Sequence, residues 1–244
     1  MGLEQIVIVL LGALAGGFVN GLTGFGTALT AMGIWLYAIP PTVASSLVIA
    51  CSVISHIQMF PLLRKVFDWR LVAPFVVPGL IGVPIGTWLL PMIDPRLFKI
   101  VVGFVVAAYA TYALLKKPGA GTPFGGRITD GAIGFSGGVL GGLAGLSGAL
   151  LVVWCDVRAW GKEHRRTVLQ TFNFAILAFA LASHAVSGLL TRDVGIALLA
   201  ALPGTLVGAW FGARLYLRLG DRNYQQVIMV LLLVSGVMLL WTNW

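Results

Sequence analysis

Long apolar segments follow one another along the whole chain, and no other feature restricts its fold as strongly. A helix rises about 1.5 Å per residue, so about 20 apolar residues cross the hydrocarbon core of a membrane. Only 10% of the 244 residues are charged, against about 25% in a typical soluble domain. The sequence therefore predicts an all-α polytopic membrane protein. Its apolar segments are 5–40, 42–63, 71–91, 97–115, 129–154, 167–190, 194–213 and 224–243.

The positive charge of the chain lies between these segments. The formal net charge is +8, but nearly all of the 16 Lys and Arg residues occupy the short gaps. Such a distribution orients membrane helices, and it does not indicate a nucleic-acid partner. The two cysteines, Cys51 and Cys155, form no CxxC pattern, so we interpret both as small apolar residues. We expect no metal and no other cofactor.

An internal repeat divides the chain into two related halves. Residues 16–29, GGFVNGLTGFGTAL, match residues 137–150, GGVLGGLAGLSGAL, at seven of fourteen positions. The correspondence then shifts by four residues and continues. The later pairs are Ser46 with Thr171, Asp68 with Asp193, and Pro78-Gly79 with Pro203-Gly204; the GxxxG pair Gly82 and Gly86 recurs, one residue further on, as Gly208 and Gly212. We predict repeats over 1–117 and 129–244, joined by a loop over 118–128.

The basic residues predict how the halves lie in the membrane. Segment 5–40 is too long for one span and is interrupted by Gly21, Gly24 and Gly26. If every segment crossed once, alternate gaps would hold nine and seven basic residues, which is no asymmetry. If the first segment of each half folds back as a hairpin, one side holds thirteen and the other three. The second arrangement satisfies the positive-inside rule.

This arrangement predicts two inverted repeats, each a glycine-broken helix hairpin followed by three transmembrane helices. Both termini then face outward from a bacterial-type inner membrane, which the protein crosses several times. The outer side holds Arg96, Lys99 and Arg192. The inner side holds Arg64, Lys65, Arg70, Lys116, Lys117, Arg127, Arg158, Lys162, Arg165, Arg166, Arg214, Arg218 and Arg222.

The two glycine-rich breaks, at residues 20–26 and 141–148, predict a binding site. Broken helices are tolerated in membranes where they line a polar cavity, and paired breaks in inverted halves mark the binding sites of transporters. A helix that starts after a break presents free N–H groups and the positive end of its dipole, which favours an anion. The predicted ligands at the breaks are Asn20, Thr23, Gly24, Gly26, Thr27, Gly145, Ser147 and Gly148.

A second polar set follows on the next helix of each half. Amides and hydroxyls can hold an oxyanion without a buried charge. The alternative is that these hydroxyls bond to carbonyls of their own helix. For the glycines the alternative is tight helix packing, which we prefer for the Gly82/Gly86 and Gly208/Gly212 pairs. The second set consists of Ser45, Ser46, Gln170, Thr171 and Asn173.

Two histidines, His56 and His184, lie inside apolar segments. Ionisable residues there are costly and often functional, and a histidine that titrates could couple transport to protons. The alternative is that each histidine lies near a helix end and bonds to a carbonyl.

Together these motifs resemble the TauE/SafE family, also called TSUP. The resemblance rests on the glycine-rich breaks, on residues 165–173 (RRTVLQTFN), on His184 with Gly188, and on Pro203-Gly204. It spans essentially the whole chain. It implies a duplicated membrane protein that moves sulfite, sulfonates or other small organic anions. Where the family has a Thr-Ser pair, this chain has Ser45-Ser46 and Gln170-Thr171.

The sequence thus predicts a secondary transporter that moves a small anion, such as sulfite or an organosulfonate, by alternating access. No GxxxxGK[ST] loop is present, so we expect coupling to a proton or sodium gradient instead of ATP. A passive anion channel is the first alternative. An intramembrane enzyme is less favoured, because no HExxH motif and no paired membrane carboxylates appear. The sequence leaves homodimer formation open.

Overall fold

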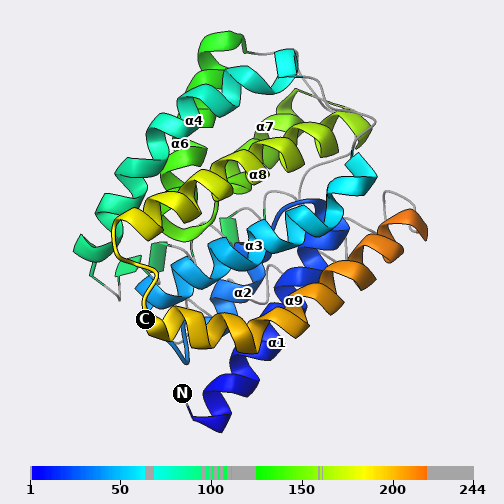
Figure 1. Ribbon diagram of the computed structural model, residues 1–244. Helices are drawn as coiled ribbons and strands as arrows, with labels where there is room; N and C mark the ends of the chain where they lie inside the picture. The colour runs from blue at the N-terminus through cyan, green and yellow to red at the C-terminus, as the bar shows by residue number, and fades with distance from the viewer. Residues whose placement is uncertain are drawn as a thin grey trace.

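The computed structural model is all-helical (Figure 1). It describes residues 2–63, 69–94, 97–98, 100–101, 104, 107–108, 111, 125–158, 160 and 162–218, and this part contains no strand. Five of its helices are long and apolar enough to cross a membrane. The predicted all-α polytopic membrane protein is therefore confirmed. The elements are α1 (Leu3–Thr23), α2 (Thr27–Trp35), α3 (Pro41–Leu63), α4 (Trp69–Leu89), η1 (Leu90–Met92), α6 (Arg127–Ala144), α7 (Gly148–Val157), α8 (Lys162–Val186) and α9 (Arg192–Arg218).

The first apolar segment forms the hairpin that the sequence predicts, with α2 folded back along α1. Between the two helices, Gly24 and Gly26 have φ angles of 77° and 96°, a left-handed conformation that glycine adopts without steric cost. At the far end of the hairpin, Trp35 Nε1 donates to the Val9 carbonyl at 3.0 Å. A break at one end and a side-chain anchor at the other therefore fix the hairpin.

The second half repeats this hairpin with α6 and α7. Gly145 has a φ of 67°, and its N–H bonds to the Gly141 carbonyl. Trp154 Nε1 donates to the Asp130 carboxylate at 2.7 Å. Asp130 follows Val9 by 121 residues, the same offset that relates residues 16–29 to 137–150. In each hairpin a tryptophan of the second helix therefore bonds to the corresponding residue of the first helix.

Glycines join helices from different halves: α1 packs along α9, and α6 along α4. A Cβ atom added at Gly138 would lie 2.0 Å from the Gly79 carbonyl oxygen, and one added at Gly212 would lie 2.1 Å from the Phe18 oxygen. Only glycine allows backbones to approach this closely. Gly82 and Gly86 make the same kind of contact with α6, which is the packing role that the sequence predicts for them.

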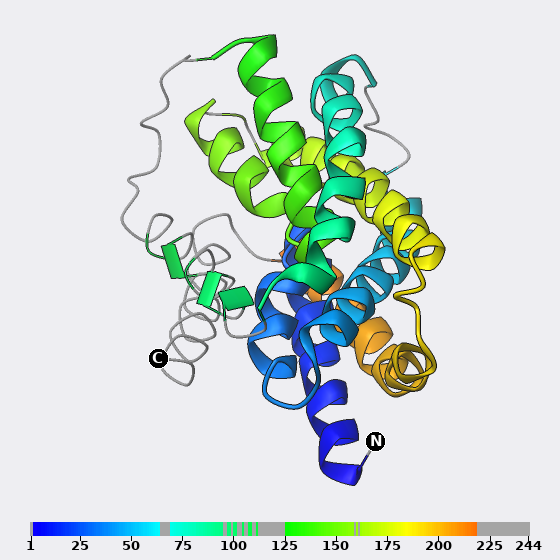
Figure 2. The same ribbon diagram turned by 90° about the vertical axis from the view of Figure 1, so that its left-hand side faces the viewer.

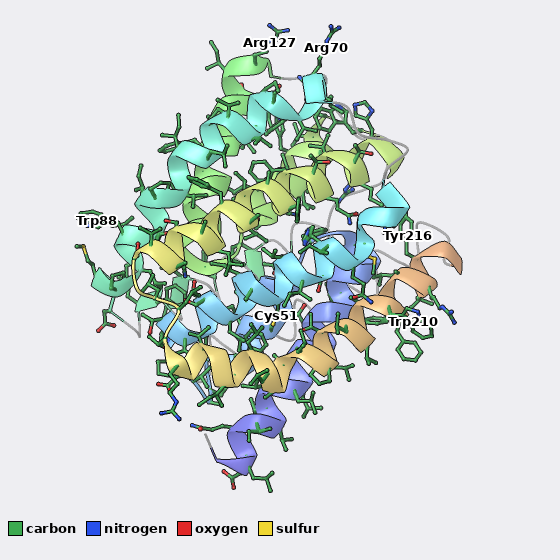
Figure 3. The ribbon with its side chains drawn as sticks, viewed as in Figure 1. Cys51, Arg70, Trp88, Arg127, Trp210 and Tyr216 are labelled. Atoms are coloured by element: carbon green, nitrogen blue, oxygen red, sulfur yellow. The ribbon has the colours of Figure 1, made fainter. Side chains whose placement is uncertain are left out.

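Both of these helix pairs are parallel. Gly204 faces Leu10, and eight residues later Gly212 faces Phe18, so α1 and α9 run in the same direction. Figure 3 shows Arg70 and Arg127, at the beginnings of α4 and α6, at the same end of the molecule.

The helices α3 and α8 lie between the two pairs (Figures 1 and 2). They are antiparallel, because Ser46 meets His184 at one end and His56 stacks on Phe174 further along. Large apolar side chains such as Trp88 and Leu199 point away from this centre and are exposed, as expected of a surface that faces lipid. Polar groups are thus concentrated at the centre of the molecule.

The last apolar segment, 224–243, and most of segment 97–115 lie outside the described residues. The repeat boundaries and the inversion of the two halves stay predictions. The observed hairpins and helix bounds agree with the pieces predicted for the remaining segments.

Candidate functional site

Both helix breaks border a single small cavity at the centre of the molecule. Its central free volume, measured as the space that the centre of a water molecule can occupy, is about 10 Å³. This is room for roughly one water molecule. A four-atom anion would not fit without movement, so the site must widen before it can hold such an anion. The lining residues come from α1, α2, α3, α7, α8 and both breaks: Asn20, Phe25, Gly26, Thr27, Ala28, Leu29, Ser52, His56, Gly145, Leu146, Ser147, Gly148, Ala149, Asn173 and Leu177.

Two helix N-termini open into this cavity. The α2 helix begins at Thr27, and its N-cap residue Gly26 supplies no side-chain capping bond. The α7 helix begins at Gly148, which also borders the cavity. The first N–H groups of a helix have no partner within the helix, and the aligned peptide dipoles place partial positive charge there. The cavity therefore combines two positive helix ends from the two halves.

Asn173 connects the two breaks. Its Nδ2 atom donates to the Gly24 carbonyl of the first break at 3.3 Å. Its Oδ1 atom accepts a hydrogen bond from Ser147 Oγ of the second break at 2.7 Å. A Cβ atom added at Gly148 would lie 2.8 Å from Asn173 Nδ2, so glycine is required for this contact. One side chain from α8 thus holds both broken helices.

Three buried polar atoms of cavity-lining residues have no hydrogen-bond partner within the part of the chain that the structure describes. They are Asn20 Oδ1, Thr27 Oγ1 and His56 Nε2. Buried polar groups are normally paired, so these atoms are available to a ligand or to water. The His56 Nδ1–H donates to the Ser52 carbonyl at 2.6 Å, which leaves Nε2 without its proton in the neutral ring. Nε2 lies near the Gly24 carbonyl but makes no hydrogen bond of good geometry with it.

The cavity lining carries no Asp, Glu, Lys or Arg among the described residues. Its polarity comes from amides, hydroxyls, one imidazole and two helix ends. Such a set can stabilise a negative charge without a fixed counter-ion.

The sequence was compared with models of known protein families. The model of the sulfite exporter TauE/SafE family matches residues 8–239, nearly the whole chain. The chain belongs to the TauE/SafE family. Comparisons with curated proteins and with solved structures gave no match. TauE/SafE membership and the apolar helices together establish a multi-pass membrane protein of a transporter family.

Seven of the ligands predicted for this TauE/SafE protein line the cavity, and two more lie directly beside it. Thr23 and Gly24 lie beside it and shape the break: Thr23 Oγ1 accepts from the Phe25 N–H at 3.0 Å and donates to the Val19 carbonyl at 2.9 Å. The predicted residues that line the cavity are Asn20, Gly26, Thr27, Gly145, Ser147, Gly148 and Asn173, together with His56.

The remaining predicted ligands do not line the cavity. Ser45 Oγ donates to the Leu143 carbonyl at 2.6 Å and ties α3 to α6. Gln170 is buried against Gly24, and its Oε1 atom has no partner. Thr171 is half-buried on α8.

The other predicted histidine, His184, is fully buried, and both of its ring nitrogens are engaged. Nε2 lies 2.7 Å from the Gly142 carbonyl, and Nδ1 lies 2.9 Å from Ser46 Oγ. It therefore fixes α8 against α6 and α3. A role of His184 in proton coupling stays a prediction.

The sequence interpretation missed Ser52 and the GxSxG string at Gly134–Gly138. Ser52 precedes His56 by four residues, one helical turn, and this spacing is the signal that could have found it. The GxSxG string lies within helix α6 and not on a strand-to-helix turn, and Ser136 is exposed. It therefore lacks the structural context of a nucleophile elbow.

Proposed function

We propose that this protein is a secondary transporter that binds one small anion, such as sulfite or an organosulfonate, in the central cavity. The observation that carries the proposal is the meeting of two helix N-termini, one from each half, in a cavity lined by neutral polar groups. Each helix end favours an anion by about 0.3–1 kcal/mol, and by up to about 2 kcal/mol where it is partly buried.

Alternating access is supported by the small size of the cavity, which must widen to admit an anion, and by the arrangement of the helix pairs. Helix α1 of the first half packs on α9 of the second half, and α6 of the second half packs on α4 of the first half. The parallel direction of both pairs is the direction that an inverted arrangement requires. Movement of one helix pair against the other around α3 and α8 would open the cavity to one side at a time.

Proton coupling is assigned to His56. Its unprotonated Nε2 can take up a proton in the cavity and then donate a hydrogen bond to the anion. Proton and anion would bind together, because each stabilises the other. A sodium-coupled mechanism would instead need oxygen ligands for the cation, and among the described cavity-lining residues Asn20 Oδ1 and Thr27 Oγ1 have no partner.

The test is proton-gradient-driven uptake of labelled sulfite and methanesulfonate into proteoliposomes. We expect saturable uptake that Asn20→Ala and Asn173→Ala each lower by about tenfold or more in kcat/KM, the loss expected for a hydrogen bond to a charged group. Ser136→Ala, on the exposed face of α6, is the matched control and should transport like the intact protein.

No saturable uptake of either anion would contradict the proposed cargo, and full activity of the Asn173 variant would contradict the proposed site. A passive anion channel is separated by its energetics. A channel passes the anion only down its electrochemical gradient, whereas the proposed transporter accumulates it against that gradient.

A further inference from the structure

One face of α8 continues from the cavity toward the basic end of the helix. Asn173 and Leu177 line the cavity, and Gln170 and Arg166 precede them on the same face at helical spacing. Arg166 lies seven residues before Asn173, which is about 10 Å along a helix. A cationic side chain therefore lies above the neutral cavity, on the side of the predicted inner loops.

Buried polar atoms without partners mark this side of the cavity. Arg166 Nη1, Gln170 Oε1 and Ser55 Oγ are buried and have no hydrogen-bond partner in the described part of the chain. Gln170 and Arg166 lie between the cavity and the basic end, because they precede Asn173 on α8, whereas Ser55 lies at the level of the cavity, between its lining residues Ser52 and His56. Buried polar atoms are normally paired, so the unpartnered atoms of Ser55 at the cavity and of Gln170 and Arg166 beyond it mark a polar connection along α8.

The opposite ends of the same two helices differ. Ser45 bonds to the Leu143 carbonyl, and Ser46 and His184 bond to each other. His184 also contacts the Gly142 carbonyl. On α3 and α8, the unpartnered buried atoms of the described residues therefore lie at the level of the cavity or toward the basic end.

Arg166 is held in place by an aromatic ring. Its guanidinium carbon lies 3.5 Å from the centroid of the Tyr216 ring on α9. This stacking occupies one face of the guanidinium plane and leaves the N–H groups at its edge for hydrogen bonds. Figure 3 shows Tyr216 near the end of α9, on the side where α8 begins.

We propose that Arg166 and Gln170 form a second anion subsite, through which the transported oxyanion passes between the basic side and the central cavity. The guanidinium attracts the anion and pairs with its oxygens through two N–H groups. The Gln170 side-chain amide then transfers the anion to Asn173, one helical turn further on. This inference rests on the proposed transport function.

The test compares Arg166→Gln with Arg214→Gln in proteoliposomes. Arg214 is the matched control, since it lies toward the same end of α9 and stacks on an exposed tryptophan, Trp210, at 3.7 Å. For sulfite flux we expect Arg166→Gln to lower kcat/KM by about tenfold or more and to weaken its dependence on ionic strength. Arg214→Gln should stay within about twofold of the intact protein.

Two further variants keep the test decisive. Arg166→Lys keeps the charge but loses the paired N–H groups, so it should restore part of the flux. Gln170→Leu removes the amide without touching Arg166 and should also lower flux. In both Arg166→Gln and Gln170→Leu, equilibrium sulfite binding to the purified protein should be retained, because the cavity ligands are intact.

Each outcome has a separate meaning. Absence of flux in the intact protein contradicts the proposed function. Normal flux in Arg166→Gln, beside an active intact protein, overturns the subsite alone. A loss of flux that appears only in vesicles containing anionic lipid, and not in phosphatidylcholine vesicles, also overturns it, because Arg166 then binds the headgroup of an anionic lipid.

Discussion

At the residue scale, a few polar side chains hold the broken helices together. Asn173 bonds to both breaks, and it can do so because Gly148 leaves space beside its amide. The sequence predicted Asn173 as a ligand from its polarity within an apolar helix. It did not predict that Gln170 would lie outside the cavity, because this depends on the rotation of α8 against α3, which packing sets.

The two buried histidines should respond differently to substitution by glutamine. His56→Gln removes the group proposed to carry the proton, so uptake should no longer accelerate with an inward proton gradient. His184→Gln breaks contacts to Gly142 and Ser46, and we expect its Tm to fall by about 5 °C, for a loss of about 2 kcal/mol. Uptake assays and thermal unfolding in detergent check the two variants.

His164→Ala, at an exposed histidine, is the control and should leave both properties unchanged. If uptake by His56→Gln follows the proton gradient as before, His56 does not carry the coupling proton.

At the scale of elements, glycines determine both where helices break and where they pack. The breaks fell where the sequence predicted them, since a left-handed residue between two apolar helices needs glycine. The partners of the glycine-rich helices could not be predicted. GxxxG patterns show that a backbone approaches closely, but not which helix of the other half it meets.

Glycine substitutions test these helix pairs. A Cβ atom at Gly21 would lie 2.1 Å from the Ala209 carbonyl oxygen, so Gly21→Ala must separate α1 from α9. We expect it to destabilise the protein by about 1–3 kcal/mol, as overpacking does. Gly195 on α9 has no atom within 4 Å of such a Cβ, so Gly195→Ala should keep or raise the Tm. Equal Tm values for the two variants would contradict the described packing.

At the scale of the whole molecule, the asymmetry of basic residues predicts which side each loop faces. Arg70 and Arg127 lie at one end of the structure (Figure 3), in agreement with their assignment to the same side. The hairpins could be predicted from the sequence, because glycines interrupt the long apolar segments. The packing of α1 on α9 and of α4 on α6 could not be predicted from the sequence, because contacts between α1 and α9 join residues about 190 positions apart.

Single-cysteine labelling tests the predicted topology. Cysteines introduced at Arg70 and Arg127 should react with a membrane-impermeant maleimide only from the inner side, and one at Thr191 only from the outer side. Cys51 and Cys155 are buried, so their background labelling should be low. Labelling of Arg70→Cys and Arg127→Cys from opposite sides would contradict the inverted arrangement.

The central claim is that the molecule carries an anion in the central cavity between its halves. Counterflow tests it most directly: proteoliposomes loaded with unlabelled sulfite are diluted into a trace of labelled sulfite without an imposed gradient of protons or sodium. We predict a transient accumulation of label above equilibrium that Asn173→Ala abolishes and Ser136→Ala preserves. Equilibration without overshoot, or no uptake of label, would contradict a carrier with its site at this cavity.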